Sequence, residues 1–203
     1  MKRLVAAGVV GLARILAGGN VLRIGFTPDE KQRIYFANHT SHLDFILVWS
    51  ALPPRLRVLT RPVAGKDYWD KGGLRGYISR EVFNSVLIER DRVNRTTNPI
   101  DVLLEGLGDR HSLIVFPEGT RGNGREIAPF KSGLYRVAMA RPDIELVPVY
   151  LDNLARVLPK GEFFPVPMLA SVSFGEPMRV EDGEEKQAFL ERARKAVLEL
   201  RQW

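Results

Sequence analysis

The stretch RIYFANHTSHLDFILVWS, residues 33–50, consists of an apolar run, a polar turn and a second apolar run. The first run, residues 33–37, is rich in aromatic and branched side chains and predicts a buried strand. The second, residues 42–50, predicts a short apolar helix that ends before a pair of prolines. Ser41 or Thr40 is expected to cap that helix at its N-terminus. A strand that leads directly into a helix is typical of α/β proteins.

The rest of the chain alternates strand-like and helix-like segments in the same way. Strands are expected at residues 21–26, 57–60, 86–89, 112–116, 145–151 and 169–174. Helices are expected at residues 67–80, with a break at Gly72-Gly73, and at 99–107, 132–140 and 186–200. Pro148, inside an apolar strand, predicts an edge or strand-start position. The pattern indicates a single α/β domain, with a central mixed sheet flanked by helices and an N-terminal amphipathic helix.

The composition limits the classes of function. The chain has 203 residues, 45% of them hydrophobic, which suits one domain with a substantial core. The absence of cysteine excludes disulfides, a thiol nucleophile and a cysteine-rich metal site, and three histidines leave little material for a structural metal site. The net charge of +6 favours anionic partners such as lipid headgroups, coenzyme A phosphates or an acidic carrier protein. Nucleic acid is not expected, because the basic residues are interleaved with acidic ones.

The first 17 residues predict an amphipathic helix at a membrane surface. On a helical wheel, one arc of about 140° collects apolar residues. These are Leu4, Val5, Val9, Leu12, Ile15 and Leu16, with Lys2, Arg3 and Arg14 opposite them. Such a helix lies in the headgroup region of a bilayer. Two alternatives are an ordinary helix docked on the domain and a secretory signal, although a basic residue interrupts the apolar region of such a signal. No apolar stretch reaches about 18 residues, so no transmembrane helix is expected.

The polar turn after residues 33–37 contains a histidine and an aspartate. His39 lies just outside the expected helix and Asp44 in its first turn, so that the carboxylate can reach one imidazole nitrogen. The other nitrogen can then act as a base at the end of the sheet, where sites of α/β proteins open. A histidine oriented by a carboxylate is suited to removing a proton from an alcohol. His42 is the alternative base, but two residues from Asp44 on a helix its side chain points away.

The sequence Phe-Pro-Glu-Gly-Thr-Arg, residues 116–121, follows another expected strand. Gly119 permits backbone conformations that expose amide groups, and Arg121 offers a planar fork for phosphate. Glu118 is expected to orient a substrate hydroxyl or to hold Arg121. The alternative is a simple turn with a surface ion pair, but further basic and aromatic residues continue the loop as far as Lys131, which favours a binding surface. Arg90 ends a third strand and is expected to meet a phosphate at the same edge of the sheet.

These blocks resemble those of the glycerolipid acyltransferase family, which includes lysophosphatidate and glycerol-3-phosphate acyltransferases. The family's block Asn-His-x-Ser-x-x-Asp is met by Asn38, His39, Ser41 and Asp44. Its block Phe-Pro-Glu-Gly-Thr-Arg is met letter for letter at residues 116–121. The order and spacing of the blocks extend the resemblance from about residue 33 to residue 152.

The resemblance implies an acyl transfer from acyl-coenzyme A or acyl carrier protein to a lysophospholipid or glycerol phosphate. It carries the base role to His39 and the supporting role to Asp44. It assigns binding of the acceptor phosphate to a set of four residues: Arg90, Glu118, Gly119 and Arg121. The resemblance also implies that the reaction needs neither a metal nor a cofactor and forms no covalent acyl-enzyme, with acyl-coenzyme A or acyl carrier protein as the co-substrate. The expected product is phosphatidic acid, made from 1-acylglycerol-3-phosphate.

The chain departs from the family pattern at three places. Asn84 stands where the family usually has a glycine, and asparagine also tolerates positive φ. The segment before residue 33 lacks the long hydrophobic anchor of many relatives, and the region after residue 152 carries no family signature. Phe163-Phe164 in that region is a candidate for a loop that dips into lipid.

The sequence therefore predicts residues 1–20 as a membrane-associating helix and residues 21–203 as an acyltransferase domain. Its expected place is the cytoplasmic face of the cell membrane, as a peripheral or monotopic protein next to anionic lipid. Other acceptors, including an amino-lipid without phosphate, are alternatives. Two other classes also remain: a hydrolase in which His39 activates water, and a lipid-binding module without catalysis.

Overall fold

The structure is a computed structural model, and it describes residues 2–17, 20–41, 43–70, 72–89, 98–124, 126–152 and 170–202. Within these residues the centre is a seven-stranded sheet in the order β1-β7-β6-β2-β5-β3-β4. The strands are β1 (Asn20–Arg23), β2 (Arg33–Ala37), β3 (Thr60–Gly65), β4 (Val86–Ile88), β5 (Ser112–Val115), β6 (Glu145–Asp152) and β7 (Ser171–Phe174). Only β6 and β7 pair antiparallel, so the sheet is mixed, as predicted.

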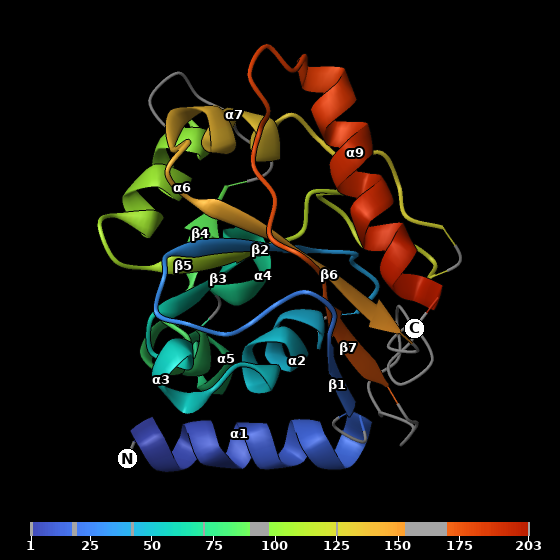
Figure 1. The fold of residues 1–203 in the computed structure, drawn as a ribbon. Coiled ribbons are helices and arrows are strands. Elements are labelled where there is room, and N and C mark those ends of the chain that lie inside the picture. Colours follow the sequence, from blue (N-terminus) through green and yellow to red (C-terminus); the bar gives the residue numbers. More distant parts are fainter. Residues whose placement is uncertain are drawn as a thin grey trace.

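Helices cover both faces of this sheet (Figure 1). They are α1 (Lys2–Ala17), α2 (Asp44–Ala51), α3 (Pro54–Arg57), α4 (Lys66–Trp69), α5 (Leu74–Tyr77), α6 (Pro99–Leu107), α7 (Gly133–Ala140) and α9 (Lys186–Glu199). A π-helical turn η1 (Ile78–Val82) follows α5, and a 3-10 turn η2 (Leu200–Gln202) follows α9. In Figure 1 the helices α6, α7 and α9 lie above the sheet, whereas α1, α2, α3 and α5 lie below it.

The central strand β2 divides the hydrophobic core into two clusters. All five of its residues are buried. Successive side chains of a strand point to opposite faces, so Ile34 and Phe36 pack with α6, α7 and α9, while Tyr35 and Ala37 pack with α1 and α2. Because β2 is covered on both faces and paired on both edges, its carboxyl end is a rigid point from which a functional residue can project.

The expected elements are largely present, with two local corrections. The strand expected at residues 57–60 is wrong, because Pro54 starts the short helix α3 and the strand begins only at Thr60. β3 contains Pro62 and Gly65, which disguise a strand in the sequence because both residues are depleted in strands. The expected capping of α2 by a hydroxyl side chain is met in a shifted form: Leu43 holds the cap position without a side-chain bond, and the Ser41 hydroxyl accepts the N–H of Leu43 at 3.3 Å.

Pro148 does not lie at a sheet edge, since β6 pairs with β2 on one side and β7 on the other. The reason that a proline fits there is a gap in the ladder on the β7 side. Val149 pairs with Phe174, whereas the next bridge joins Leu146 to Met178. Between these points two residues of β6 face three residues of the neighbouring segment, as in a bulge. Gly175 donates its N–H to the Pro148 carbonyl at 2.9 Å, and the missing N–H of Pro148 lies where the regular ladder is interrupted.

The helix α1 docks on the domain through small and branched side chains. Val10 and Ala13 are buried, and Ala6 and Val9 pack against the same cluster. Its partners are α2 and η1. Leu4, by contrast, is 78% exposed. No helix in the described part of the chain is long and apolar enough to cross a membrane.

Candidate active site

The turn after β2 is fastened to the neighbouring strand by Asn38. Its side-chain amide donates to the carbonyl of Leu151 at 3.0 Å, and its side-chain oxygen accepts the N–H of Leu151 at 2.8 Å. The two bonds imitate one more ladder pair and carry the chain past the last strand residue in a fixed direction. His39 therefore starts from a defined position at the carboxyl end of a parallel strand, where sites in such sheets open.

His39 and Asp44 form a hydrogen-bonded pair. The distance between His39 Nδ1 and Asp44 Oδ2 is 2.8 Å. The same carboxylate oxygen accepts the backbone N–H groups of Thr40 at 2.6 Å and Ser41 at 2.9 Å. Asp44 is 0% exposed and the imidazole 13%. Since a carboxylate only accepts, Nδ1 carries the proton, and Nε2 is the nitrogen left to act as a base.

The loop after β5 holds the backbone and the ring of His39. Glu118 Oε1 accepts the His39 N–H at 2.7 Å, and the His39 carbonyl accepts the N–H of Gly122 at 2.8 Å. The imidazole is stacked on the ring of Phe116, with centroids 4.3 Å apart and an angle of 21° between the planes. The two family blocks are thus one structural unit, in which the second block positions the base of the first.

Glu118 is a buried carboxylate whose two oxygens both accept backbone N–H groups. Its second oxygen accepts from Ala128 at 2.9 Å, and the residue is only 4% exposed. Burial raises the pKa of Glu118, while the bonds from Ala128 and His39 act in the opposite direction. In this position Glu118 joins the His39 turn to the loop before α7. This arrangement differs from the two expected contacts of Glu118, with a substrate hydroxyl or with Arg121.

A cavity of about 790 Å³ opens beside His39. This volume is within the range of about 300–1,000 Å³ typical of small-molecule sites. Its apolar walls come from β2, β5, α6 and α7. They include Ile34, Leu113, Ile100, Leu103, Leu134 and Val137. The cavity thus leads from the base at the sheet edge into an apolar space between the sheet and the helices α6 and α7.

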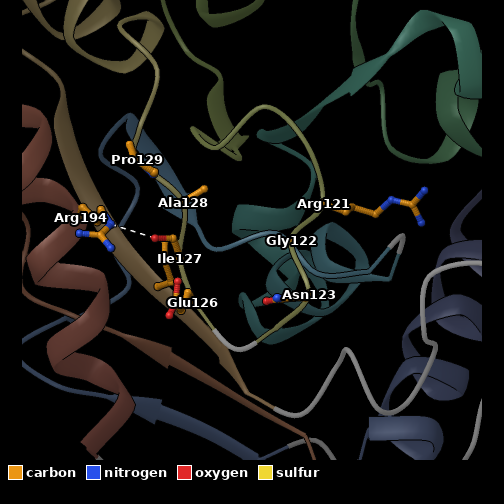
Figure 2. Close-up of a pocket in the computed structure, with 8 residues that line it drawn as sticks. All are labelled: Arg121, Gly122, Asn123, Glu126, Ile127, Ala128, Pro129 and Arg194. Atoms are coloured by element: carbon orange, nitrogen blue, oxygen red, sulfur yellow. Dashed lines mark hydrogen bonds between the residues drawn. The ribbon is translucent and has the colours of Figure 1, made fainter.

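Arg121 and Gly119 also line this cavity. Figure 2 shows the part of this loop from Arg121 onward, with the Arg121 side chain extending away from the other labelled residues. The far part of the loop is tied to α9, because Arg194 Nε donates to the Ile127 carbonyl at 2.9 Å. Arg121 is therefore free to point toward the cavity while the loop itself is fastened behind it.

Two of the histidine and arginine predictions lie outside the described residues: His42 and Arg90. The turn before β4 is described, and Asn84 has a φ of 49°. This confirms that asparagine adopts the positive φ for which the family usually has glycine. The site therefore brings together His39, Asp44, Gly119 and Arg121 at one edge of the sheet, with Glu118 directly behind them.

A family model described as "Acyltransferase" matches residues 20–152, which is more than half of the chain. The chain belongs to the acyltransferase family. This confirms the resemblance that the two sequence blocks indicate. The matched region contains the His39–Asp44 pair, the loop after β5 and most of the apolar cavity wall.

The relatives of this chain carry consistent names. It is 31% identical over 127 residues to the 1-acyl-sn-glycerol-3-phosphate acyltransferase of Salmonella typhimurium, covering 59% of this chain and 46% of the relative. It is 24% identical over 177 residues to the enzyme of that name from Cocos nucifera, covering 83% and 53%. The chain thus spans about half the length of the curated relatives that it matches.

The fold is also that of a solved structure. The crystal structure of the 1-acyl-sn-glycerophosphate (LPA) acyltransferase PlsC from Thermotoga maritima matches with a TM-score of 0.75, covering 99% of this chain and 80% of that chain. The sequence identity is 19%, so the match concerns the fold alone. It confirms the predicted α/β architecture with a helix before the sheet.

Several contacts of this site could not be predicted from the sequence. Phe116 stacks on the base, and Tyr68 and Trp69 of α4 line the cavity. Apolar residues of α6 and α7 also line the cavity, and the sequence could not show this, because a stripe that lines a cavity has the same spacing as one that packs. Lys131, which the sequence placed in a binding surface, is seen to line the cavity only in the structure.

Proposed function

We propose that this acyltransferase moves a fatty acyl group from a thioester to the free hydroxyl of 1-acylglycerol-3-phosphate, which gives phosphatidic acid. The observation that carries the proposal is the His39–Asp44 pair at the entrance of an apolar cavity. A base beside an apolar space suits a reaction between a hydroxyl and a long acyl chain. The names of the relatives support this acceptor.

In the proposed reaction, His39 Nε2 takes the proton from the acceptor hydroxyl as the oxygen attacks the thioester carbonyl. The new carbon–oxygen bond forms a tetrahedral intermediate. When it collapses, the carbon–sulfur bond breaks, and the leaving thiolate takes the proton back from the imidazolium. Asp44 stabilises the imidazolium and keeps the ring in one orientation. Proton balance is complete without a metal or a cofactor, and the thioester of coenzyme A or acyl carrier protein serves as co-substrate.

The acyl chain has a place in the apolar cavity, and the acceptor phosphate has one at its rim. Each buried methylene contributes about 0.8 kcal/mol, so an acyl chain in the cavity between the sheet and α6 and α7 is strongly held. Arg121 supplies a fork of N–H donors suited to phosphate. Arg90, from the end of β4, is proposed as a second cation, and Gly119 as a source of close backbone approach.

The same proposal places the protein on the cytoplasmic face of the cell membrane as a peripheral protein. Support comes from α1, which packs on the domain with one side and leaves its other side exposed to solvent. Leu4 is exposed, and a side chain built at Gly8 or Gly11 would meet no atom within 4 Å. The described residues on the open side of α1, Leu4, Ala7, Gly8 and Gly11, carry no charge, and the net charge of +6 attracts anionic lipid next to it.

The test is a direct assay of purified protein with labelled acyl-coenzyme A, or labelled acyl carrier protein, and a panel of acceptors. The panel contains 1-acylglycerol-3-phosphate, glycerol-3-phosphate, another lysophospholipid and an amino-lipid. The expected product is labelled phosphatidic acid. Labelled free fatty acid alone would identify a hydrolase, and binding without any product would identify a lipid-binding module. Either result would overturn the proposal.

A further inference from the structure

The side chain of Lys131 lies flat across Gly119. A Cβ atom added to Gly119 would lie 2.6 Å from Lys131 Nζ, 2.7 Å from Cε and 2.9 Å from Cδ. Gly119 also has a φ of 75°, which side chains other than glycine rarely adopt. The backbone of Lys131 is fixed in turn, because its N–H donates to the Pro117 carbonyl at 2.8 Å. Because Gly119 has no side chain, it leaves the space that the Lys131 side chain occupies.

The described part of the chain leaves the ammonium group of Lys131 available for a ligand. Among the residues that the structure describes, it forms no ion pair and no hydrogen bond, and the residue is exposed. A lysine side chain that is held in one direction loses rotamer freedom, which costs free energy unless a contact offsets it. None of the carboxylates in the described part of the chain makes such a contact with the Lys131 ammonium group.

The charges around the cavity are separated by sign. Arg121 and Lys131, on the loop between β5 and α7, line it together with His39. The carboxylates in its wall, Asp67 and Glu89, come instead from α4 and from the end of β4. Glu89 is already paired, with Lys66 at 3.1 Å. An anion that enters this cavity is therefore attracted to the loop that carries Gly119.

We propose that Lys131, lying across Gly119, binds the phosphate of the acceptor lipid together with Arg121. This inference rests on the proposed function and adds a contact that the sequence blocks do not contain. In 1-acylglycerol-3-phosphate only one methylene and one ester oxygen separate the hydroxyl-bearing carbon from phosphorus. The phosphate must therefore lie close to the base. A point charge from Lys131 and a planar fork from Arg121 complement each other on such a group.

The test is Lys131→Met, which keeps an apolar stem and removes the charge. Losing one charged hydrogen bond to phosphate should raise the KM for 1-oleoylglycerol-3-phosphate about tenfold. The KM for acyl-coenzyme A and the turnover of monooleoylglycerol, which has no phosphate, should stay unchanged. Lys131→Arg should restore most of the affinity. Lys186→Met is the matched control, because Lys186 is exposed on α9 outside the cavity and its loss changes the net charge equally.

A binding measurement separates this inference from the proposed function. Trp69 lines the cavity, so its fluorescence can report the titration of 1-oleoylglycerol-3-phosphate without turnover. A Kd raised about tenfold by Lys131→Met, in a protein that transfers no acyl group, would support the phosphate contact and reject the reaction. Unchanged KM and Kd in an active protein would reject the contact alone. A rise only in the KM for acyl-coenzyme A would also overturn it, since Lys131 would then bind the donor.

Discussion

Asp44 combines complete burial with three N–H donors on a single carboxylate oxygen. Two of the donors belong to the backbone, so the carboxylate is positioned whether or not His39 is present. The imidazole, stacked on Phe116, is the third donor. A base held in this way loses little entropy when the substrate arrives, which is the advantage of a preorganised site.

Replacing His39 by alanine should lower turnover by a factor of about 10² to 10⁴, the usual contribution of an oriented base. Asp44→Asn should also lower it severely, because the amide presents a donor or a weaker acceptor to three N–H groups. Steady-state kinetics measures both effects, and circular dichroism checks that the His39 variant stays folded. His42→Ala serves as the control. An inactive His42 variant beside a fully active His39 variant would show that the other histidine is the base.

Glu118 and Arg121 should differ in how their loss affects the kinetics. Glu118→Gln places an amide donor against the N–H of His39 or Ala128, so it should displace the base and lower kcat. Arg121→Ala should instead raise the KM for the phosphorylated acceptor and leave a phosphate-free alcohol unaffected. A KM effect for Glu118→Gln that is specific to phosphorylated acceptors would contradict the positioning role and favour direct substrate contact.

The burial of Glu118 also has a consequence for pH. Its pKa is raised in the folded protein, so folding favours the protonated form of this group. The stability it contributes is present below its ordinary pKa and is lost as pH rises through the raised value. The melting temperature of the wild type relative to Glu118→Gln should therefore fall as pH rises through this window. A difference that is independent of pH would show that the carboxylate is not the titrating group.

At the scale of elements, the spacing of apolar residues predicts a helix or strand well where one face is buried. It predicts less well where a proline stands inside the element. The helix at residues 186–200 was predicted, and Phe189, Ala193 and Val197 on its inner side are all fully buried. β3 was misplaced because Pro62 stands inside a paired strand. Pro148 was expected at an edge because the sequence cannot show that the regular hydrogen-bond ladder is interrupted opposite it.

The helix α1 gives the sharpest test at this scale, because its two sides should respond differently to substitution. Leu4→Glu and Ala7→Glu change the exposed side, so both should weaken binding to anionic vesicles and leave the melting temperature unchanged. Val10→Ser changes the docked side, and it should lower the melting temperature because it buries a hydroxyl in an apolar contact. Sedimentation with vesicles and thermal melting, on the same samples, measure both effects.

The opposite pattern, in which Leu4→Glu melts early and binds vesicles normally, would place the membrane contact elsewhere. Removal of residues 1–17 is a weaker experiment than these substitutions. It would uncover the buried contacts of Val10 and Ala13 with the domain, and so mix a loss of stability with a loss of membrane binding.

At the scale of the whole molecule, the sequence predicts the members of the site better than its shape. His39, Asp44 and the loop at residues 116–121 lie in blocks whose order alone implies that they meet at one sheet edge. The cavity depends instead on how α6 and α7 stand off from β2 and β5. That spacing is a property of the packed fold, and no local pattern encodes it. The path of Lys131 over Gly119 is of the same kind, since it joins residues from two ends of one loop.

The net charge of the molecule should make its binding to membranes depend on salt. A net charge of +6 near an anionic surface attracts over a distance set by salt, with a Debye length of about 10 Å at 0.1 M and about 3 Å at 1 M. Binding to anionic vesicles should therefore weaken steeply as salt is raised. Turnover of a short-chain, water-soluble acceptor should depend on salt much less, because that acceptor reaches the cavity without a membrane. Vesicle sedimentation and the soluble assay in one salt series separate the two. Vesicle binding that does not change with salt would mean that apolar contact alone, through the open side of α1, holds the protein at the membrane.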